Sequence, residues 1–397
     1  MSFLDGLAIV GFLIASLASA MTALNLRRLP RTPSVDASAV VDDEQLSVAI
    51  PARNEAVNIE ACIRSVLAGG VDSVRVYVYD DQSDDATPSI VERLCAGDAR
   101  VRLVPTQPMP AGWCGKQHAC WRLAQAAMTD DATDGWMLFI DADVRIEPDG
   151  LRRTLAHARE LDADNRLGLL STFPRQVTRS LGEALLVTSI FFILLSYLPF
   201  GRMRRTLDPA ASAACGQFML VKQSCYTAFG GHESLKDSMH DGVKMPRLAR
   251  QHGYRTDLFD GPDIASCRMY DSFRAAWAGF AKNAFEGLGS TVLLLILTVL
   301  HLLGHILPPL VFATSVVVGI TGPSVPWLAI AASGGATLLG IAQRLVIAAR
   351  EQHTIAASPL HAVGVLLMTA VQWWSLYLHL TGRRSWRGRT LQQVSPQ

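Results

Sequence analysis

Long apolar stretches at both ends of the chain enclose a central region in which apolar and polar positions alternate. The first stretch, Phe3 to Leu26, contains a single charged residue. Near the other end, Ser290 to Ala349 contains one, and Ser358 to Thr381 contains none. Because a helix needs about 20 apolar residues to cross a hydrocarbon core, each stretch is long enough to span a membrane. The pattern predicts membrane helices at both ends and a folded domain between them.

The predicted membrane segments have the following limits. The first is a retained anchor over residues 1–26, since it lacks the basic start and the small-residue cleavage site of a signal peptide. The second is a transmembrane region over residues 290–381. Its part from Ser290 to Gly322 is long for one span and short for two, and Pro308-Pro309 near the middle favours a tight hairpin. With two later spans the region crosses four times and ends in a basic tail, residues 382–397.

Basic residues flank the predicted spans and set their orientation. The first span is followed by Arg27, Arg28 and Arg31, and the last by Arg383, Arg384, Arg387 and Arg389. Because such residues accumulate on the cytoplasmic side, both flanks and the domain between them are predicted to be cytoplasmic, in a multi-pass protein of the cell (inner or plasma) membrane. In a four-span arrangement Arg344 and Arg350 would lie outside, against the same rule.

The central region predicts an alternating α/β domain. The predicted strands are Ser47–Ile50, Val74–Tyr79, Val101–Val104 and Trp136–Ile140, and the helices between them are Glu55–Ala68, Thr87–Cys95 and Gln117–Ala127. Strands that alternate with helices through short connections form a mostly parallel, Rossmann-like sheet with right-handed crossovers. We expect this domain to cover residues 46–285.

Polar residues follow three of the predicted strands. They are Pro51, Arg53, Asn54 and Glu55 after the first strand, Asp80 and Asp81 after the second, and Asp141 and Asp143 after the fourth. The carboxyl ends of parallel strands meet at one edge of the sheet, where α/β folds bind ligands. Two carboxylates spaced Asp-x-Asp suit Mg²⁺ or Mn²⁺, which prefer oxygen ligands shared with a phosphorylated substrate. Each cluster alone is also compatible with an ordinary polar turn, but their convergence favours a site.

Composition narrows the class of protein. Of 397 residues, 50% are hydrophobic and only 18% are charged, below the roughly 25% of ordinary soluble proteins. The net charge is +1, and the central region has no contiguous basic face, so no nucleic-acid partner is expected. The seven cysteines include no C-x-x-C pair and indicate buried, reduced side chains rather than disulfides or a zinc site.

Together with Gly112-Trp-Cys-Gly-Lys116, the three polar clusters resemble the family 2 glycosyltransferases of the GT-A fold. Two later segments, Arg268-Met-Tyr270 and Gly279-Phe-Ala-Lys-Asn283, are similar to the membrane-anchored branch that glycosylates hopanoids, carotenoids (the diaponeurosporenoate type) or related lipids. The resemblance covers about residues 46 to 285. It implies a GT-A domain, a nucleotide-sugar donor carrying UDP or GDP, and a lipid acceptor at the membrane.

The resemblance also implies roles for individual residues. It implies that Asp143 and Asp141 bind Mg²⁺ or Mn²⁺ on the diphosphate. The donor itself would be bound by Pro51, Arg53, Asn54, Glu55, Asp80, Asp81, Lys116 and Asp141. Asp241 matches the acid that serves as general base at the start of a helix. The chain departs from the family at His240, where an acid is common, and this leaves the basicity of Asp241 open. The alternative for Asp241 is a helix cap.

Residues 184–200 form an apolar segment inside the predicted domain. Followed by Gly201-Arg-Met-Arg-Arg205, the segment is typical of an interfacial helix with basic anchors that brings a lipid acceptor to the site, although a buried helix also fits. The Gln/Arg-x-x-Arg-Trp signature of processive relatives is not intact, since only Arg274-Ala-Ala-Trp277 stands there.

The sequence therefore predicts a membrane glycosyltransferase that moves a sugar from a nucleotide-diphospho-sugar to a lipid acceptor, with inversion at the anomeric centre. Two alternatives remain open at this stage. One is a polysaccharide synthase, and the other is a transporter or membrane scaffold whose α/β domain only binds nucleotide.

Overall fold

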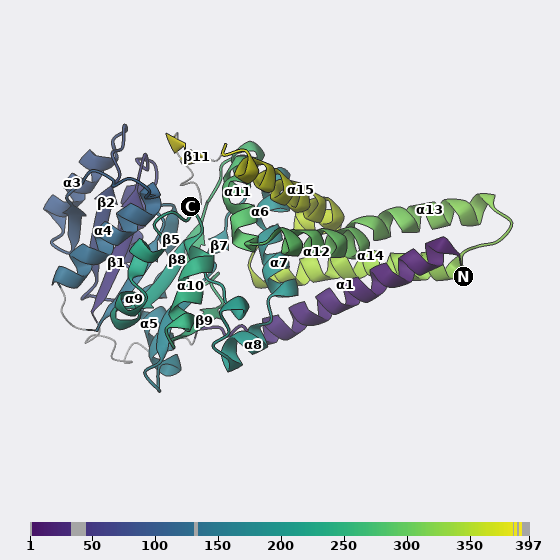
Figure 1. Ribbon diagram of the computed structural model, residues 1–397, viewed down its shortest axis with the longest axis horizontal. Coiled ribbons are helices and arrows are strands. Elements are labelled where there is room, and N and C mark those ends of the chain that lie inside the picture. The colour runs from purple at the N-terminus through teal and green to yellow at the C-terminus, as the bar shows by residue number, and fades with distance from the viewer. Residues whose placement is uncertain (1, 33–44, 131–133, 384, 387–388, 391–397) are drawn as a thin grey trace. The chain divides into compact units, whose positions relative to one another are not determined.

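The computed structural model describes residues 2–32, 45–130, 134–383, 385–386 and 389–390, and the chain divides into two compact units (Figure 1). The α/β unit contains Leu29–Arg175 and Phe200–Arg268. The helical unit contains Met1–Arg28, Gln176–Pro199 and the described residues of Met269–Gln393. The helical unit is therefore assembled from three separate stretches of chain, the middle of which interrupts the α/β unit.

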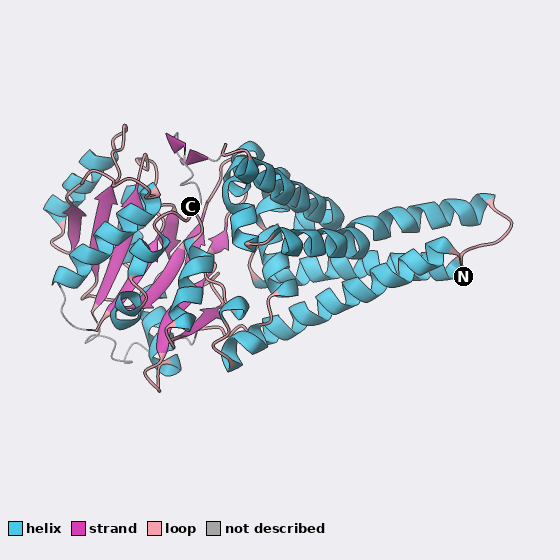
Figure 2. Ribbon diagram, in the orientation of Figure 1, coloured by secondary structure: helices cyan, strands magenta, loops and turns pink. Residues whose placement is uncertain are grey.

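A seven-stranded sheet forms the centre of the α/β unit (Figure 2). Its strands are β1 (Leu46–Ala52), β2 (Arg75–Asp80), β3 (Val101–Val104), β4 (Trp136–Ile140), β6 (Leu167–Thr172), β8 (Phe218–Lys222) and β9 (Arg255–Phe259). Their order is β3-β2-β1-β4-β8-β6-β9, and all run parallel except β8, which is antiparallel to both neighbours. The prediction of a mostly parallel sheet is confirmed. Smaller strands are β5 (Val144–Ile146), β7 (Arg175–Gln176) and β10 (Ala265–Cys267).

Helices follow most of these strands along the chain. They are α2 (Ile59–Leu67), α3 (Thr87–Gly97), α4 (Gly115–Asp130), α5 (Gly150–Leu161), α8 (Phe200–Arg205), α9 (Gln223–Ala228) and α10 (Asp241–Gln251), with short 3₁₀ turns η1 (Pro209–Ala211) and η2 (Gly231–Leu235). Between the sheet and α4, the side chains of Tyr77, Phe139, Leu169 and Met219 are at most 2% exposed. Burial of this order stabilises a fold by about 2 kcal/mol per large side chain and holds the strand ends in place.

Ten helical segments make up the helical unit. They are α1 (Phe3–Arg28), α6 (Leu181–Val187), α7 (Ser189–Tyr197), α11 (Phe273–Leu288), α12 (Thr291–His301), η3 (Leu302–Ile306), α13 (Leu307–Thr321), α14 (Trp327–Arg350), η4 (Ile355–Leu360) and α15 (His361–Leu380). A small hairpin follows, made of β11 (Ser385–Trp386) and β12 (Arg389–Thr390). By length and composition, four helices can cross a membrane: Phe3–Arg28, Thr291–Thr321, Trp327–Arg350 and Ile355–Leu380.

The predicted hairpin between Ser290 and Gly322 is wrong. Thr291–Thr321 is one continuous helix in which η3 is a π-helical turn. A proline ring clashes with the carbonyl four residues earlier in a regular α-helix, and the wider π turn directly before Pro308-Pro309 provides the extra room. The described C-terminal region therefore contains three long apolar helices instead of four, and the predicted tail of residues 382–397 lies largely outside the described residues.

Residues 184–200 belong to a buried pair of helices and not to an interfacial one. In α7, Phe191, Phe192 and Leu195 are at most 3% exposed. The predicted basic anchors belong to the α/β unit, where Arg202 pairs with Asp208 and Arg204 with Asp257. The buried alternative is the one that the chain adopts.

Polar side chains join the helices inside the helical unit. The Gln343 amide donates to Thr22 Oγ1 at 2.6 Å and to Ser196 Oγ at 2.8 Å, which ties α14 to α1 and α7. The neighbouring Arg344 guanidinium donates to the carbonyl oxygens of Ala184 and Leu185, both at 3.3 Å, near the end of α6. Because an unpaired polar group is costly in an apolar surrounding, these contacts specify how the helices pack.

Candidate active site

The two acids of the Asp-x-Asp pair lie directly after β4, between the main sheet and β5. Burial raises the pKa of Asp143 to about 7, and the charges of Asp141 and Glu55 act in the same direction. Within the described residues, Asp143 Oδ1 is buried and has no hydrogen-bond partner. Asp143 thus has a buried oxygen atom without a partner and feels the charges of two further acids, an arrangement that a bound cation would stabilise.

The donor set fits a hard divalent ion. Among the described residues, no group of three or more His, Cys, Asp or Glu side chains converges on one point, as a structural zinc site requires. Mg²⁺ and Mn²⁺ need only one or two protein carboxylates and take the rest of their ligands from water and substrate phosphates. Asp141 and Asp143 meet that requirement.

Lys116, at the start of α4, connects the predicted metal pair to the predicted base. Its Nζ atom lies 2.8 Å from Asp141 Oδ1 and 3.2 Å from Asp241 Oδ2, and it donates to Gly216 O at 3.2 Å. Burial alone would lower the pKa of Lys116, but the charges of Asp141 and Asp241 raise it well above its usual value. The ammonium group is therefore charged and fixes both carboxylates around itself.

Asp241 is the first residue of α10 and is 5% exposed. Burial acts to raise the pKa of Asp241, but the positive charge of Lys116, helped by His232 and His240, outweighs it and brings the pKa below its usual value. The carboxylate is therefore ionised at neutral pH. Its Oδ1 accepts from the adjacent Gly242 N–H at 2.7 Å, and its other oxygen faces Lys116, so its contacts exceed those of a helix cap.

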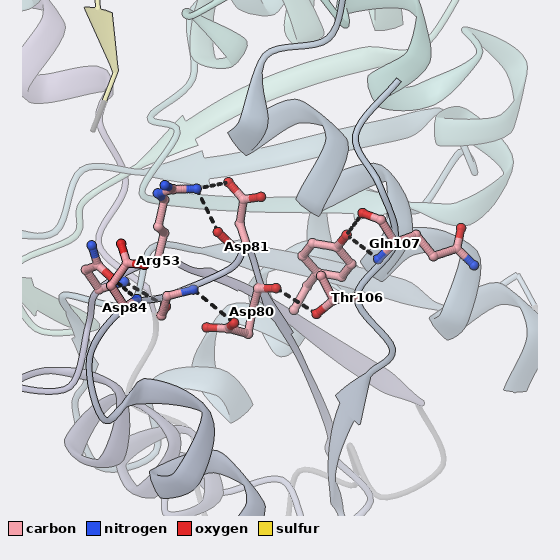
Figure 3. A network of polar contacts seen from close by, with 9 residues as sticks. Arg53, Asp80, Asp81, Asp84, Thr106 and Gln107 are labelled. Carbon is pink, nitrogen blue, oxygen red and sulfur yellow. Dashed lines mark hydrogen bonds and ion pairs between the residues drawn. The ribbon is translucent and has the colours of Figure 1, made fainter. Parts of the chain in front are cut away.

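A second cluster lies where β1 and β2 end (Figure 3). The Arg53 guanidinium donates to Asp81 O at 2.8 Å and to Asp81 Oδ2 at 3.4 Å. Thr106 Oγ1 donates to Asp80 O at 2.9 Å, which ties the loop after β3 to the same place. Asp80 and Asp81 are buried at 7% and 4% exposure. Carboxylates held in this way can accept hydrogen bonds from a base or a ribose.

The end of β1, which extends past the predicted Ile50 to Ala52, and the loop after it supply the other predicted donor-binding residues. Pro51 is paired with Tyr79 in the β1–β2 register. Asn54, in the left-handed backbone region at φ 55°, donates its N–H to Ser83 Oγ at 2.8 Å. Glu55 N–H donates to Thr87 Oγ1 at 2.8 Å. These contacts lock the loops after β1 and β2 together, and the effect of Glu55 on Asp143 links this cluster to the metal pair.

Several residues of the site could not be recognised in the sequence. Gly216 is one, because a Cβ atom there would collide with Asp241 Oδ1, so only glycine fits. Cys267 is another, and it is opposite Val144 in the β5–β10 ladder, next to Asp143. Single glycine and cysteine residues within apolar runs carry no motif, and only the folded chain brings them to the carboxylates.

The chain is similar to known glycosyltransferases. Residues 47–228 match the profile of Glycosyl transferase family 2. A curated "4,4'-diaponeurosporenoate glycosyltransferase" of Staphylococcus aureus (strain bovine RF122 / ET3-1) is 27% identical over 254 residues, and the match spans 62% of this chain and 63% of that protein. Its counterpart in strain N315 is 26% identical over 282 residues, 70% of this chain and 69% of that protein.

The fold is shared with a solved glycosyltransferase. The structure of the mannosyltransferase PcManGT from Pyrobaculum calidifontis, in complex with GDP-Man and Mn²⁺, matches with a TM-score of 0.51 and 18% identity. The match covers 95% of this chain and 99% of that one. Residues 47–228 therefore belong to glycosyl transferase family 2, on a chain that has the GT-A fold.

Proposed function

We propose that the protein is a membrane glycosyltransferase that transfers a sugar from a UDP- or GDP-sugar to a lipid hydroxyl or carboxyl group, with inversion. One observation carries the proposal: a single ammonium group, that of Lys116, contacts both an acid of the Asp-x-Asp pair and the acid at the start of α10. A cation-binding carboxylate and an ionised base on either side of one positive charge suit the displacement of a nucleoside diphosphate.

The donor would be held from two sides. Asp80 and Asp81, fixed by Thr106 and Arg53, would accept hydrogen bonds from its base and ribose. Asp141 and Asp143 would hold Mg²⁺ or Mn²⁺, which when bound neutralises charge that develops on the leaving diphosphate. Lys116 adds a fixed positive charge beside Asp141.

Asp241 would take the proton of the acceptor. It is ionised because Lys116 outweighs its burial, so it can accept a proton from a hydroxyl that attacks the anomeric carbon. With one base and no second carboxylate assigned as a nucleophile, the displacement is direct and the configuration inverts. A carboxyl acceptor would arrive already ionised and would depend on Asp241 far less.

A lipid acceptor is supported by two independent features. The curated relatives carry a name that ends in diaponeurosporenoate glycosyltransferase, which specifies a carotenoid-type carboxylate as the acceptor of those proteins. This chain also has four helices long and apolar enough to cross a membrane. An enzyme anchored in the membrane and a lipid acceptor diffuse in the same plane. They therefore meet at the membrane surface, where the polar end of the lipid lies.

The test is release of nucleoside diphosphate by the full chain in nanodiscs, with Mn²⁺ or Mg²⁺, a panel of UDP- and GDP-sugars, and bacterial lipid extract present or absent. We expect lipid-dependent release from one donor. Asp143→Asn should lower turnover by about 10²–10⁴-fold and weaken donor binding, whereas Asp241→Asn should lower turnover by a similar factor and leave donor binding intact.

Asp237→Asn is the matched control. It is the same Asp→Asn substitution four residues from Asp241, but the Asp237 side chain is exposed. It should retain wild-type turnover. Full activity of Asp143→Asn or Asp241→Asn would contradict the role given to that residue. Nucleotide binding without release from any donor would contradict the enzymatic function as a whole.

A further inference from the structure

Contacts inside the helical unit fix the depth at which each helix begins and ends. A Cβ atom on Gly304 of η3 would lie 2.5 Å from the Ile14 side chain, near the middle of α1. Further along, Val311 of α13 packs with Ala8 of α1. As the residue number rises in one helix it falls in the other, so α1 and α12–α13 are antiparallel. The end of α1 and the start of α12 therefore lie at the same end of the unit, which we call the connecting end.

Helix α14 runs from the opposite end back to the connecting end. Near its start, Ala329 packs with Ala8, and near its end, Gln343 donates to Thr22. Along these contacts the residue numbers rise in both helices, so α14 is parallel to α1. Arg350, its last residue, lies at the connecting end.

Helix α15 begins halfway between the two ends of the helical unit. His361, its first residue, shares a hydrogen bond of 3.1 Å with His305, which is adjacent to Gly304 at the middle of α1. Trp373 Nε1 donates to Thr298 Oγ1 at 3.0 Å, so α15 is antiparallel to α12 and heads for the connecting end. In Figure 1, α13 and the first part of α14 continue beyond the start of α15.

We propose that η4 and α15 form a re-entrant segment, which enters the membrane from the connecting end, turns at half depth and leaves on the same side. This inference rests on the membrane placement in the proposed function. The chain then crosses completely three times, with α1, with α12–α13 and with α14. Arg383, which follows α15, emerges on the same side as the basic residues that follow α1.

The re-entrant course resolves the conflict over the arginines. Arg350 lies at the connecting end, with the other basic flanks, instead of on the outer side. Arg344 lies inside the unit, where it donates to the carbonyl oxygens of Ala184 and Leu185. A complete crossing by α15 would instead put the arginines after it on the side opposite to those after α1.

The surroundings of the turn suit a position at half depth. In η4 the side chains of Ala357 and Ser358 are at most 2% exposed and pack inside the unit, whereas Ile355 and Leu360, at 59% and 39% exposure, present apolar side chains suited to lipid. Half of the most apolar stretch of Ile355–Leu380 is buried, against 28 to 33% for the three complete crossings. At about 1.5 Å per residue, α15 is about 30 Å long and reaches past the half-core of about 15 Å, where Trp374 and Tyr377 fit an interfacial aromatic belt.

Three tagged versions of the full chain test this topology in membrane vesicles of known orientation. A protease-sensitive tag is placed before Met1, in the loop between Gly322 and Pro326, or after Gln397. The expected result is that the first two tags are digested from one side and the third from the other. A C-terminal tag digested from the same side as the loop tag would mean that α15 crosses completely, and it would overturn the proposal.

The N-terminal tag makes failure of the topology distinguishable from failure of the proposed function. If all three tags are digested from the cytoplasmic side of the vesicles, the chain is not embedded, and the membrane placement and the re-entrant segment are both wrong. If the first two tags are digested from the opposite side alone, the membrane placement stands, and the side from which the C-terminal tag is digested decides whether α15 crosses.

A second inference concerns how Asp143 is held, and it rests on different contacts. Gln217 lies just before β8, and its Nε2 atom donates to Cys267 Sγ at 2.9 Å. Its Oε1 atom accepts from Cys215 Sγ at 3.8 Å. Cys267 is opposite Val144 in the β5–β10 ladder, next to Asp143, and burial together with the charge of Asp143 raises the pKa of its thiol.

The direction of these bonds follows from chemistry. An amide nitrogen can only donate, so the Cys267 sulfur accepts from Gln217 and keeps its own proton for another partner. An ionised carboxylate can only accept, and Asp143 is the group beside that thiol. Cys215 thus donates to Gln217 and Gln217 donates to Cys267, which leaves the proton of the Cys267 thiol to be donated to Asp143.

We infer that Cys267 is a positioning residue, which holds the Asp143 carboxylate in the orientation that binds the cation. The inference rests on the metal site in the proposed function. The two oxygens of Asp143 then differ: the thiol fixes the group, while the buried Oδ1 atom without a partner stays free for the ion. Partners of this kind typically change metal affinity by about 10–100-fold.

The test is Mn²⁺ binding to the full chain in nanodiscs without donor, followed by electron paramagnetic resonance of free Mn²⁺. Cys267→Ala should raise the Kd for Mn²⁺ by about 10–100-fold, and saturating Mn²⁺ should restore most of its turnover. Cys267→Ser keeps a donor and should stay within roughly threefold of wild type. Cys225→Ala removes an equally buried thiol elsewhere in the core and should leave the Kd unchanged.

Two outcomes would overturn this inference in different ways. If Asp143→Asn loses Mn²⁺ but Cys267→Ala binds it like wild type, Cys267 has no positioning role and the metal site stands. If Asp143→Asn itself binds Mn²⁺ like wild type, the metal site is wrong and the role of Cys267 falls with it.

Discussion

At the scale of single residues, the charge of Lys116 decides the state of the proposed base. Lys116→Met keeps the length of the side chain and removes the charge that lowers the pKa of Asp241. Burial then raises this pKa, so Asp241 becomes protonated at a higher pH than in the wild type. We expect the acid limb of the turnover profile to move to higher pH, with the variant losing most relative activity at low pH.

The measurement is the ratio of variant to wild-type turnover across the pH range. Lys244→Met is the control, since the Lys244 side chain is 43% exposed and pairs with the exposed Asp237. It should give a ratio that does not vary with pH. A constant ratio for Lys116→Met would mean that Lys116 does not set the basicity of Asp241.

Gly216 gives a second prediction for a single residue. In Gly216→Ala the new Cβ atom would collide with Asp241 Oδ1, so the carboxylate must move. Because a displacement of about 1 Å in a reacting group can cost about 100-fold in rate, turnover should fall by about that factor with little change in donor binding. Gly97→Ala, where no heavy atom lies within 4 Å of the new Cβ, should retain full turnover.

The acids of the site could be predicted from the sequence, and most of their partners could not. Asp141 and Asp143 follow an apolar run, and this local pattern places them at a strand end whatever the rest of the chain does. Lys116 was expected at the donor diphosphate, yet its contact with Asp241 depends on the fold bringing the start of α4 to the start of α10, which are far apart in sequence. The contribution of Cys267 depends in the same way on the pairing of β10 with β5.

At the scale of elements, the interhelical contacts of Gln343 predict a loss of stability. Gln343→Leu leaves Thr22 and Ser196 without their amide donor. Interhelical hydrogen bonds in membranes contribute about 0.6 kcal/mol on average and up to about 1.7 kcal/mol, so the two together should contribute about 1–2 kcal/mol. Thermal unfolding in detergent measures the effect.

Leu345→Ala is the control for this element, because Leu345 is 40% exposed on the outside of the same helix. It should unfold close to the wild-type temperature. Equal unfolding temperatures for Gln343→Leu and wild type would show that α14 packs without the help of this amide.

Elements with a strong local pattern were predicted closely, and those set by tertiary contacts were not. The strands Val101–Val104 and Trp136–Ile140 have the bounds expected from their apolar runs. The π turn of η3 carries no signal of its own, and a pair of prolines is as typical of a hairpin as of a bulged helix. The half-depth start of α15 depends on the contact between His361 and His305, which are 56 residues apart.

At the scale of the whole molecule, the middle stretch of the helical unit limits how the chain can be divided. A fragment of residues 29–268 would keep α6 and α7 but lose every helix of the first and last stretches that buries them. Their apolar side chains, Phe191, Phe192 and Leu195 among them, would become exposed. We expect this fragment to self-associate, and size-exclusion chromatography measures the result.

The control is the same fragment with residues 177–198 replaced by a flexible Gly/Ser linker. Without the apolar helices, the remaining α/β unit keeps its own core and should elute as a monomer. Monomeric behaviour of the unmodified fragment would mean that α6 and α7 do not depend on the other helices for burial.

Because the helical unit is assembled from three separate stretches of chain, the ribosome synthesises its helices at widely separated times. Helix α1 is made first, but its partner α14 begins about 300 residues later, which takes about 15–60 s at roughly 5–20 residues per second. During this interval Thr22 has no amide of Gln343 to bind. The α/β unit, complete at residue 268, has time to fold while α1 tethers the nascent chain, so the enzyme would be anchored before its last helices exist.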